Sequence, residues 1–321
     1  MSNRLNVADS PHWRDGSSLA RTHKIWLFAL VPAMVASVWL FGFHSLRIMG
    51  LAVFFSVSLD AIANILVPSK DKTTNWSSVT LAILFSFMMP CNATWWMILV
   101  GCFVMIIIGK RLFGGLGAYS VHPAMLSYAI LLVSWPERFD YTASLIFQDW
   151  GVKMVEPLRL IKTVGGSMEH VFHWQDLLVG KQVAGIGNAL VLYLLVGGLL
   201  LLITRQISWQ IPVAFIVGNL VTAGIMYYAS PGQFASPLFY LLSGGTIFAA
   251  FFLATEYTTS PVNPIPMFIF GFIGGALLML IRAYSIHADG VVFAILLINL
   301  CNPLLDRITP KIHGVEVTVN A

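Results

Sequence analysis

The sequence has little charge, because only 10% of its 321 residues are Asp, Glu, Lys or Arg. Soluble domains carry roughly 25% of these residues. Hydrophobic residues make up 58% of the chain, and the mean hydropathy is +0.81. The scarcity of charge excludes an ordinary soluble domain and predicts a protein with several membrane-spanning helices.

Cysteine is scarce as well. Cys91, Cys102 and Cys301 lie far apart and lack the close Cys or Cys/His spacing of iron–sulfur clusters and zinc sites. The chain also has no GxGxxG fingerprint, phosphate-binding glycine loop, Ser/His/Asp arrangement or nucleic-acid-binding patch. We therefore predict no metal site, no nucleic-acid partner and a chain that is not catalytic on its own.

Ten apolar stretches are candidates for membrane crossing, which takes about 20 residues. Several are shorter, and these favour half-helices or tightly packed spans beside broken backbone. The sequence thus predicts an all-α polytopic membrane protein of about ten transmembrane helices in two five-helix halves, with short or broken helices. Gly197-Gly198 and the pair Gly271 and Gly275 are spaced for close helix packing. The stretches are 25–43, 46–67, 77–90, 94–108, 123–135, 189–203, 209–228, 238–254, 264–281 and 290–305.

The distribution of basic residues predicts the orientation. With the basic N-terminal tail in the cytoplasm, eleven of the 18 Lys and Arg residues fall on that side. Both termini are then cytoplasmic, and the chain is a multi-pass protein of a bacterial inner membrane in contact with lipid. The predicted units are a tail (1–24), a first half (25–135), an exported loop (136–188), a second half (189–305) and a second tail (306–321).

A glycine-rich break follows the fourth stretch. Non-helical backbone at membrane depth persists only where it is buried in protein or lines a site, so the glycines Gly114, Gly115 and Gly117 predict a binding site. His122 stands directly before Pro123 at the head of the next stretch. Its imidazole is a candidate ligand or proton-binding group, and a structural role is the alternative.

Polar residues also occur where lipid is expected. Asp60 lies inside the second stretch, and Thr255-Glu256 ends the eighth. We predict an ion or proton path through these residues, because charged groups within spans usually face the bundle interior. The alternatives are a capped carboxylate at Asp60 and a plain cytoplasmic turn at Glu256. Arg282 and Asp289 flank the last external turn and are expected to be interface anchors.

Several motifs occur in the order typical of one family. The chain resembles, over nearly its whole length, the D-type membrane subunit of Rnf electron-transport complexes, which is related to the B-type subunit of the sodium-pumping NADH:quinone oxidoreductase. The motifs are Ser10–His12, Gly109–Gly117, His122–Met125, Ile207–Val213, Leu242–Thr246, Phe251–Glu256 and Gly290–Asn299.

The resemblance implies a flavin, with one departure. In the family, FMN is attached through a phosphoester to a threonine that precedes Pro-Leu in the exported loop. Here Pro157 and Leu158 are retained, but Glu156 occupies the acceptor position, and a carboxylate cannot form a threonyl phosphoester. The chain is therefore expected to be a divergent member without covalent FMN, and any FMN or riboflavin is expected to bind non-covalently. The residues expected near it are Gly114, Gly115, Gly117, His122, Ser243, Gly244 and Thr246.

Three functions are compatible with these residues. The first is a membrane subunit of an Rnf-like complex that takes part in electron transfer, coupled or not to Na⁺ or H⁺ translocation, with partner subunits that hold iron–sulfur clusters and flavins. The second is a redox-inactive anchor for such partners, which Glu156 favours. The third is a stand-alone secondary transporter with Asp60 and Glu256 as coupling groups, which leaves the order of the motifs unexplained.

Overall fold

The structure is a computed structural model that describes residues 18–66, 74–139, 141, 155–230 and 232–308. The secondary-structure elements within these residues are all helices, which confirms the all-α class. Four helices are long and apolar enough to cross a membrane, as expected of a polytopic membrane protein. They are α1 (Leu19–Phe41), α2 (Phe43–Leu66), α9 (Gln210–Ala229) and α12 (Pro264–Tyr284).

Four further apolar helices are shorter than a full crossing. Two of them correspond to the stretches 77–90 and 123–135, for which the sequence predicted short helices. Proline sets one boundary directly, since Pro123 is the first helical residue of its helix, a position where its missing N–H has no cost. The four are α3 (Thr74–Met88), α5 (Pro123–Ser134), α8 (Val191–Ile203) and α13 (Val291–Leu305).

The fourth and eighth apolar stretches are irregular helices. The fourth begins as α4 (Trp95–Phe103), continues as the π-helical segment η1 (Val104–Arg111) and ends in the glycine-rich turn. The eighth is interrupted at residues 243–245, where Gly244 has a φ of 62°, a conformation that favours glycine. Its three pieces are α10 (Pro237–Leu242), α11 (Thr246–Phe248) and the π-helical η5 (Ala249–Leu253).

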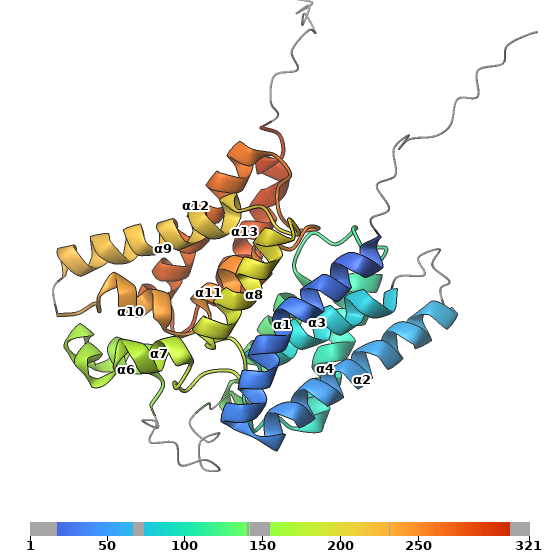
Figure 1. Cartoon of the computed structure of the whole chain (residues 1–321), viewed down its shortest axis with the longest axis horizontal. Helices are drawn as coiled ribbons and strands as arrows, with labels where there is room; N and C mark the ends of the chain where they lie inside the picture. Colours follow the sequence, from blue (N-terminus) through green and yellow to red (C-terminus); the bar gives the residue numbers. More distant parts are fainter. Residues whose placement is uncertain (1–17, 67–73, 140, 142–154, 231, 309–321) are drawn as a thin grey trace, which may run out of the picture.

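Short helices connect α5 to α8 on one side of the bundle, and Figure 1 shows α6 and α7 away from the start of α1 and the end of α13. Residues 140 and 142–154 of the predicted exported loop lie outside the described residues, as do most residues of both predicted tails. The connecting helices are η2 (Pro136–Arg138), α6 (Pro157–Val164), η4 (Gly166–Val171) and α7 (Trp174–Val179).

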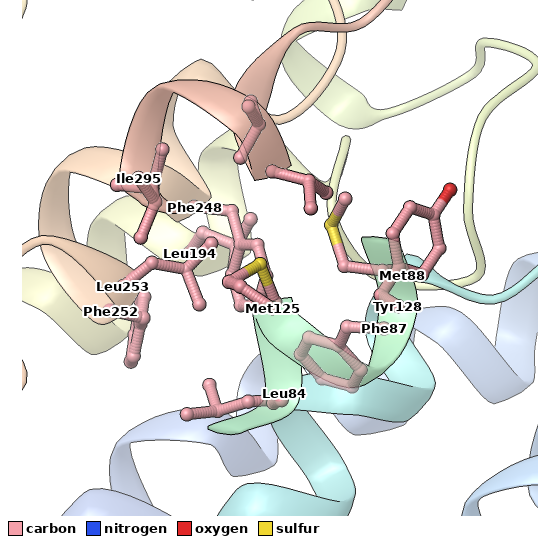
Figure 2. Packing of buried hydrophobic residues seen from close by; sticks show 14 of the residues in the cluster. Leu84, Phe87, Met88, Met125, Tyr128, Leu194, Phe248, Phe252, Leu253 and Ile295 are labelled. Atoms are coloured by element: carbon pink, nitrogen blue, oxygen red, sulfur yellow. The ribbon is translucent and has the colours of Figure 1, made fainter. Parts of the chain in front are cut away.

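The core lies where the short helices from both parts of the chain meet (Figure 2). Phe87 of α3 and Phe248 of α11 are in contact, with ring centroids 5.9 Å apart. Helix α1 also packs on α8, and α5 packs on α13. The centre of the molecule is therefore built jointly from residues before and after the connecting helices.

Glycines allow the closest helix contacts, as their spacing predicted. A Cβ atom on Gly275 of α12 would lie 2.0 Å from the carbonyl oxygen of Phe215 in α9, and one on Gly197 of α8 would lie 2.1 Å from that of Ala29 in α1. These distances are far below van der Waals contact. Both helix pairs therefore need a residue without a side chain at these points.

Gly275→Ala tests this packing. The added methyl group meets backbone, so α9 and α12 must separate, and overpacking of this kind costs about 1–3 kcal/mol. We expect a lower melting temperature in detergent, followed by tryptophan fluorescence. Gly50→Ala is the control, since Gly50 is an exposed helical glycine of α2 with no atom within 4 Å of the added carbon. Equal melting temperatures for the two variants would contradict the packing account.

Candidate functional site

Asp60 is the centre of a buried ion cluster. The carboxylate has no solvent exposure and accepts hydrogen bonds from three side chains. Lys110 Nζ lies 3.2 Å from Oδ2, Arg111 Nε lies 2.7 Å from Oδ1, and the Ser78 hydroxyl donates to Oδ2 at 2.7 Å. The predicted intramembrane acid is thus paired inside the protein.

The cations of this cluster are more deeply placed than the sequence indicated. The prediction of orientation included Lys110 and Arg111 among the basic residues on the cytoplasmic side. In the structure, Lys110 is fully buried and the Arg111 side chain is only 12% exposed. Lys110 Nζ also donates to Ser77 and Ser78, each at 2.8 Å. Asp60 is thus paired with two cations inside the bundle.

Glu256 is a second buried acid, at the turn after η5, and neutral donors surround it. Oε1 accepts from the Tyr119 hydroxyl at 2.8 Å, while Oε2 accepts from the Thr258 N–H at 3.2 Å and from the hydroxyls of Thr258 and Thr259. Burial raises the pKa of the Glu256 carboxyl above its ordinary value, and these hydrogen bonds oppose the shift. Thr255 takes no part in this set, because its hydroxyl donates to the Phe251 carbonyl at 2.6 Å.

Tyr119 joins the glycine-rich turn to Glu256. Gly114, Gly115 and Gly117 all have positive φ, from 91° to 107°, which explains why glycine is needed in the turn. Burial raises the pKa of the Tyr119 hydroxyl well above its ordinary value, so this group stays protonated and can donate. The turn is therefore fixed to the end of the eighth apolar stretch.

His122 is fully buried at the start of α5. Neither ring nitrogen has a hydrogen-bond partner among the described residues. Its backbone N–H is 3.1 Å from the Asn299 amide oxygen when that amide is oriented to suit its neighbours. His122 thus connects α5 to α13 through its backbone.

The helix break at residues 243–245 is held by Arg282. The guanidinium donates to the Tyr240 carbonyl and to the Thr246 hydroxyl, both at 2.8 Å, and to the Asp289 carboxylate at 2.9 Å. The expectation that Arg282 is an interface anchor is wrong, because the residue is only 3% exposed. It instead donates to the Tyr240 carbonyl, which the helix break leaves without a helical partner, and to the Thr246 hydroxyl.

The structure separates the two glycine segments that the sequence placed at one flavin. Tyr119 meets the chain after η5, whereas Gly244 precedes α11. The 3 and 5 residues of α11 and η5 lie between them, a distance of about 12 Å at 1.5 Å per residue. They form two separate sites, at opposite ends of this helix.

A cavity of about 390 Å³ lies beside Gly244. A Cβ atom on Gly244 would come within 2.7 Å of Leu158 and 3.0 Å of Asp289. The amide oxygen of Asn188 is buried in this wall without a hydrogen-bond partner. Glu156 lines the same cavity, directly before the first residue of α6, and the volume is in the range of small-molecule sites.

Lys162 fixes α6 above this cavity. Its amine donates to the carbonyls of Arg282 at 2.8 Å and His287 at 3.1 Å, and also to that of Ser285. A second cavity of about 370 Å³ lies on the other side of the same helix. Helix α6 therefore separates two hollows on the side of the bundle that carries the connecting helices.

Apolar helices with buried charges and interrupted helices define a polytopic membrane protein with polar sites inside its bundle. The chain belongs to the NQR2, RnfD, RnfE family, whose model matches residues 6–314.

The similar proteins are named as D-type subunits of redox complexes. The one from the Na⁺-translocating ferredoxin:NAD⁺ oxidoreductase complex of Acetobacterium woodii is 36% identical over 97% of this chain and 96% of the relative. The one from an ion-translocating oxidoreductase complex of Vibrio cholerae is 34% identical, over 96% and 99%. Its counterpart in Mannheimia succiniciproducens is 32% identical, over 98% and 99%. The resemblance inferred from the motifs is confirmed.

Asp60→Asn tests the ion cluster. Removing the acid breaks its buried ion pairs with Lys110 and Arg111, and breaking a buried pair in this way costs about 3–5 kcal/mol. We expect a large fall in melting temperature or in the yield of monodisperse protein. Asp176→Asn is the matched control, because Asp176 pairs with Lys181 at 3.9 Å with both side chains at least 36% exposed and should lose at most about 1 kcal/mol. A mild effect of Asp60→Asn would argue against the cluster.

Proposed function

We propose that this chain is the D-type membrane subunit of an ion-translocating oxidoreductase complex and takes part in its electron transfer. Family membership over nearly the whole chain and the names of its relatives support this proposal. Its cysteines have no cluster-binding spacing, so iron–sulfur clusters belong to partner subunits, together with further flavins. The chain is a non-catalytic component alone.

The proposal includes ten spans in two five-helix halves of opposite orientation. In that arrangement α1 corresponds to α8, α3 to the α10–η5 segment, and α5 to α13. Each of these corresponding pairs is in contact across the core, as helices near a pseudo-two-fold axis are. The start of α1 and the end of α13 both lie in the upper part of the view in Figure 1, away from α6 and α7, which agrees with cytoplasmic termini and an exported loop in the inner membrane.

The flavin of this subunit, FMN or riboflavin, is proposed to bind non-covalently in the cavity beside α6. The unpaired Asn188 oxygen can accept a hydrogen bond from a flavin N–H or hydroxyl. Gly244 lies in the wall of this cavity, where the side chains of Leu158 and Asp289 leave no room for a Cβ atom. When bound, a flavin supplies one-electron transfer chemistry.

Glu156 sets the character of this site. It stands where the family attaches FMN, so the covalent link is replaced by a carboxylate on the cavity wall. A carboxylate there disfavours an anionic reduced flavin and lowers its reduction potential. The presence of Glu156 at this position also favours the alternative function, in which the subunit is a redox-inactive anchor.

Asp60 and Glu256 are the proposed ion-path residues. Both are acids almost fully buried inside the helix bundle, as coupling groups in membrane proteins are. A stand-alone transporter would use them similarly, but it leaves the family relationship over residues 6–314 unexplained.

The flavin assignment is tested on the purified native complex. After denaturing electrophoresis we expect no flavin fluorescence at the 35.3-kDa band of this chain and flavin in the supernatant of acid-denatured complex. Asn188→Leu should lower the released flavin by about one equivalent, since an unpaired donor costs about 1–3 kcal/mol. Gln206→Leu, on the other side of the bundle, is the control.

The remaining outcomes separate the alternatives. Fluorescence fixed at the 35.3-kDa band would mean a covalent site elsewhere in the chain. Equal flavin release from the wild type and Asn188→Leu would place the flavin in partners and favour the anchor function.

A further inference from the structure

A water-sized cavity lies beside Glu256. It has a volume of about 20 Å³, and one water needs at least about 10–15 Å³ and two to four polar partners. The polar side chains of its wall come from α1, α3, the glycine-rich turn and the turn after η5. They are His23, Ser77, Thr80, Tyr119, Glu256 and Tyr257.

Ser77 links this cavity to the Asp60 cluster. Its hydroxyl accepts a hydrogen bond from Lys110 Nζ at 2.8 Å. The Ser77 side chain also lines the cavity, and so does Glu256, which comes from the second half of the chain. One hydroxyl and one water are therefore enough to connect Lys110 to Glu256. Three hydrogen bonds in series span roughly 8–9 Å.

The two buried acids differ in their pairing. Asp60 is paired with Lys110 and Arg111, whereas Glu256 has no ion pair among the residues that the structure describes. Of the two acids, Glu256 is therefore the one that a proton can neutralise without breaking an ion pair.

These features select a proton over Na⁺ as the ion that Glu256 takes up. A sodium ion needs several oxygen ligands, but both Glu256 oxygens already accept hydrogen bonds, and the cavity holds about one water. A metal cation would also face the ammonium of Lys110 across Ser77. A proton needs no ligand sphere and can enter through one water.

An entry route connects the cavity with solvent. His23 Nε2 lies 3.2 Å from the Tyr257 hydroxyl, and Tyr257 is 38% exposed. His23 itself is 6% exposed and lines the cavity. A single water in the cavity would therefore complete a chain from Tyr257 at the surface through His23 to the buried Glu256.

We propose that this chain of groups is a proton relay at the end of the bundle assigned to the cytoplasm, an inference that rests on the proposed function. His23 takes up a proton on its Tyr257 side and releases one on its cavity side. The cavity water accepts that proton and passes one of its own to the Glu256 carboxylate. Glu256 becomes a neutral carboxyl group, the water is regenerated, and Ser77 transmits the change in charge to Lys110 and Asp60.

The test uses the intact complex in proteoliposomes, with redox-driven proton uptake, radioactive sodium uptake and electron transfer measured together. His23→Phe removes the relay without touching the Asp60 cluster, and Ser77→Val removes the link on the other side. We expect proton uptake per electron to fall about tenfold or more in both, equivalent to about 1.4 kcal/mol in the transfer barrier. Sodium uptake per electron should stay at the wild-type value.

Ser86→Ala is the control, since Ser86 is a buried serine of the same helix whose hydroxyl donates only to the Ile83 carbonyl. It should keep proton uptake within about twofold of the wild type. Wild-type proton uptake in His23→Phe, or parallel loss of sodium uptake, would overturn the relay. A wild-type complex that moves sodium but no protons would also overturn it, whereas one without electron transfer would refute the proposed function itself.

Discussion

Backbone that leaves helical geometry inside a membrane bundle must find hydrogen-bond partners within the protein. This constraint shapes both irregular regions of the chain. After η1 the glycine-rich turn supplies its own partners, because the Gly114 and Gly115 N–H groups donate to the Arg111 and Lys110 carbonyls at 3.0 Å. At the break before α11, Arg282 satisfies the Tyr240 carbonyl. Turn hydrogen bonds at one interruption and a buried cation at the other thus satisfy the freed backbone.

The two interruptions have different chemical surroundings. The end near Glu256 is compact, with a cavity of about 20 Å³ and donors already directed at one carboxylate, which suits a proton. The end near Gly244 opens into about 390 Å³ and keeps an unpaired amide oxygen at Asn188, which suits a planar organic molecule. Helix α11 and η5 join the two ends.

Much of the architecture follows from local sequence, because apolar length and glycine or proline position are local properties. All ten predicted stretches contain helix, and the predicted break falls at Gly114, Gly115 and Gly117, whereas the break at residues 243–245 inside the eighth stretch was not predicted. The partners of the charges were not predictable in this way. Asp60 and Lys110 are 50 residues apart, and Tyr119 and Glu256 are 137 apart, so only the fold brings them together. Asn188 carries no motif, and its significance comes from a missing partner in a cavity wall.

The central claim is that this chain holds a flavin beside α6 without a covalent bond. The most direct measurement is an experimental density map of the purified native complex that resolves side chains around this cavity. The account predicts a planar tricyclic density within hydrogen-bonding distance of Asn188, with no continuous density to Glu156. A cavity closed by side chains or filled by lipid, with every flavin located in partner subunits, would contradict it.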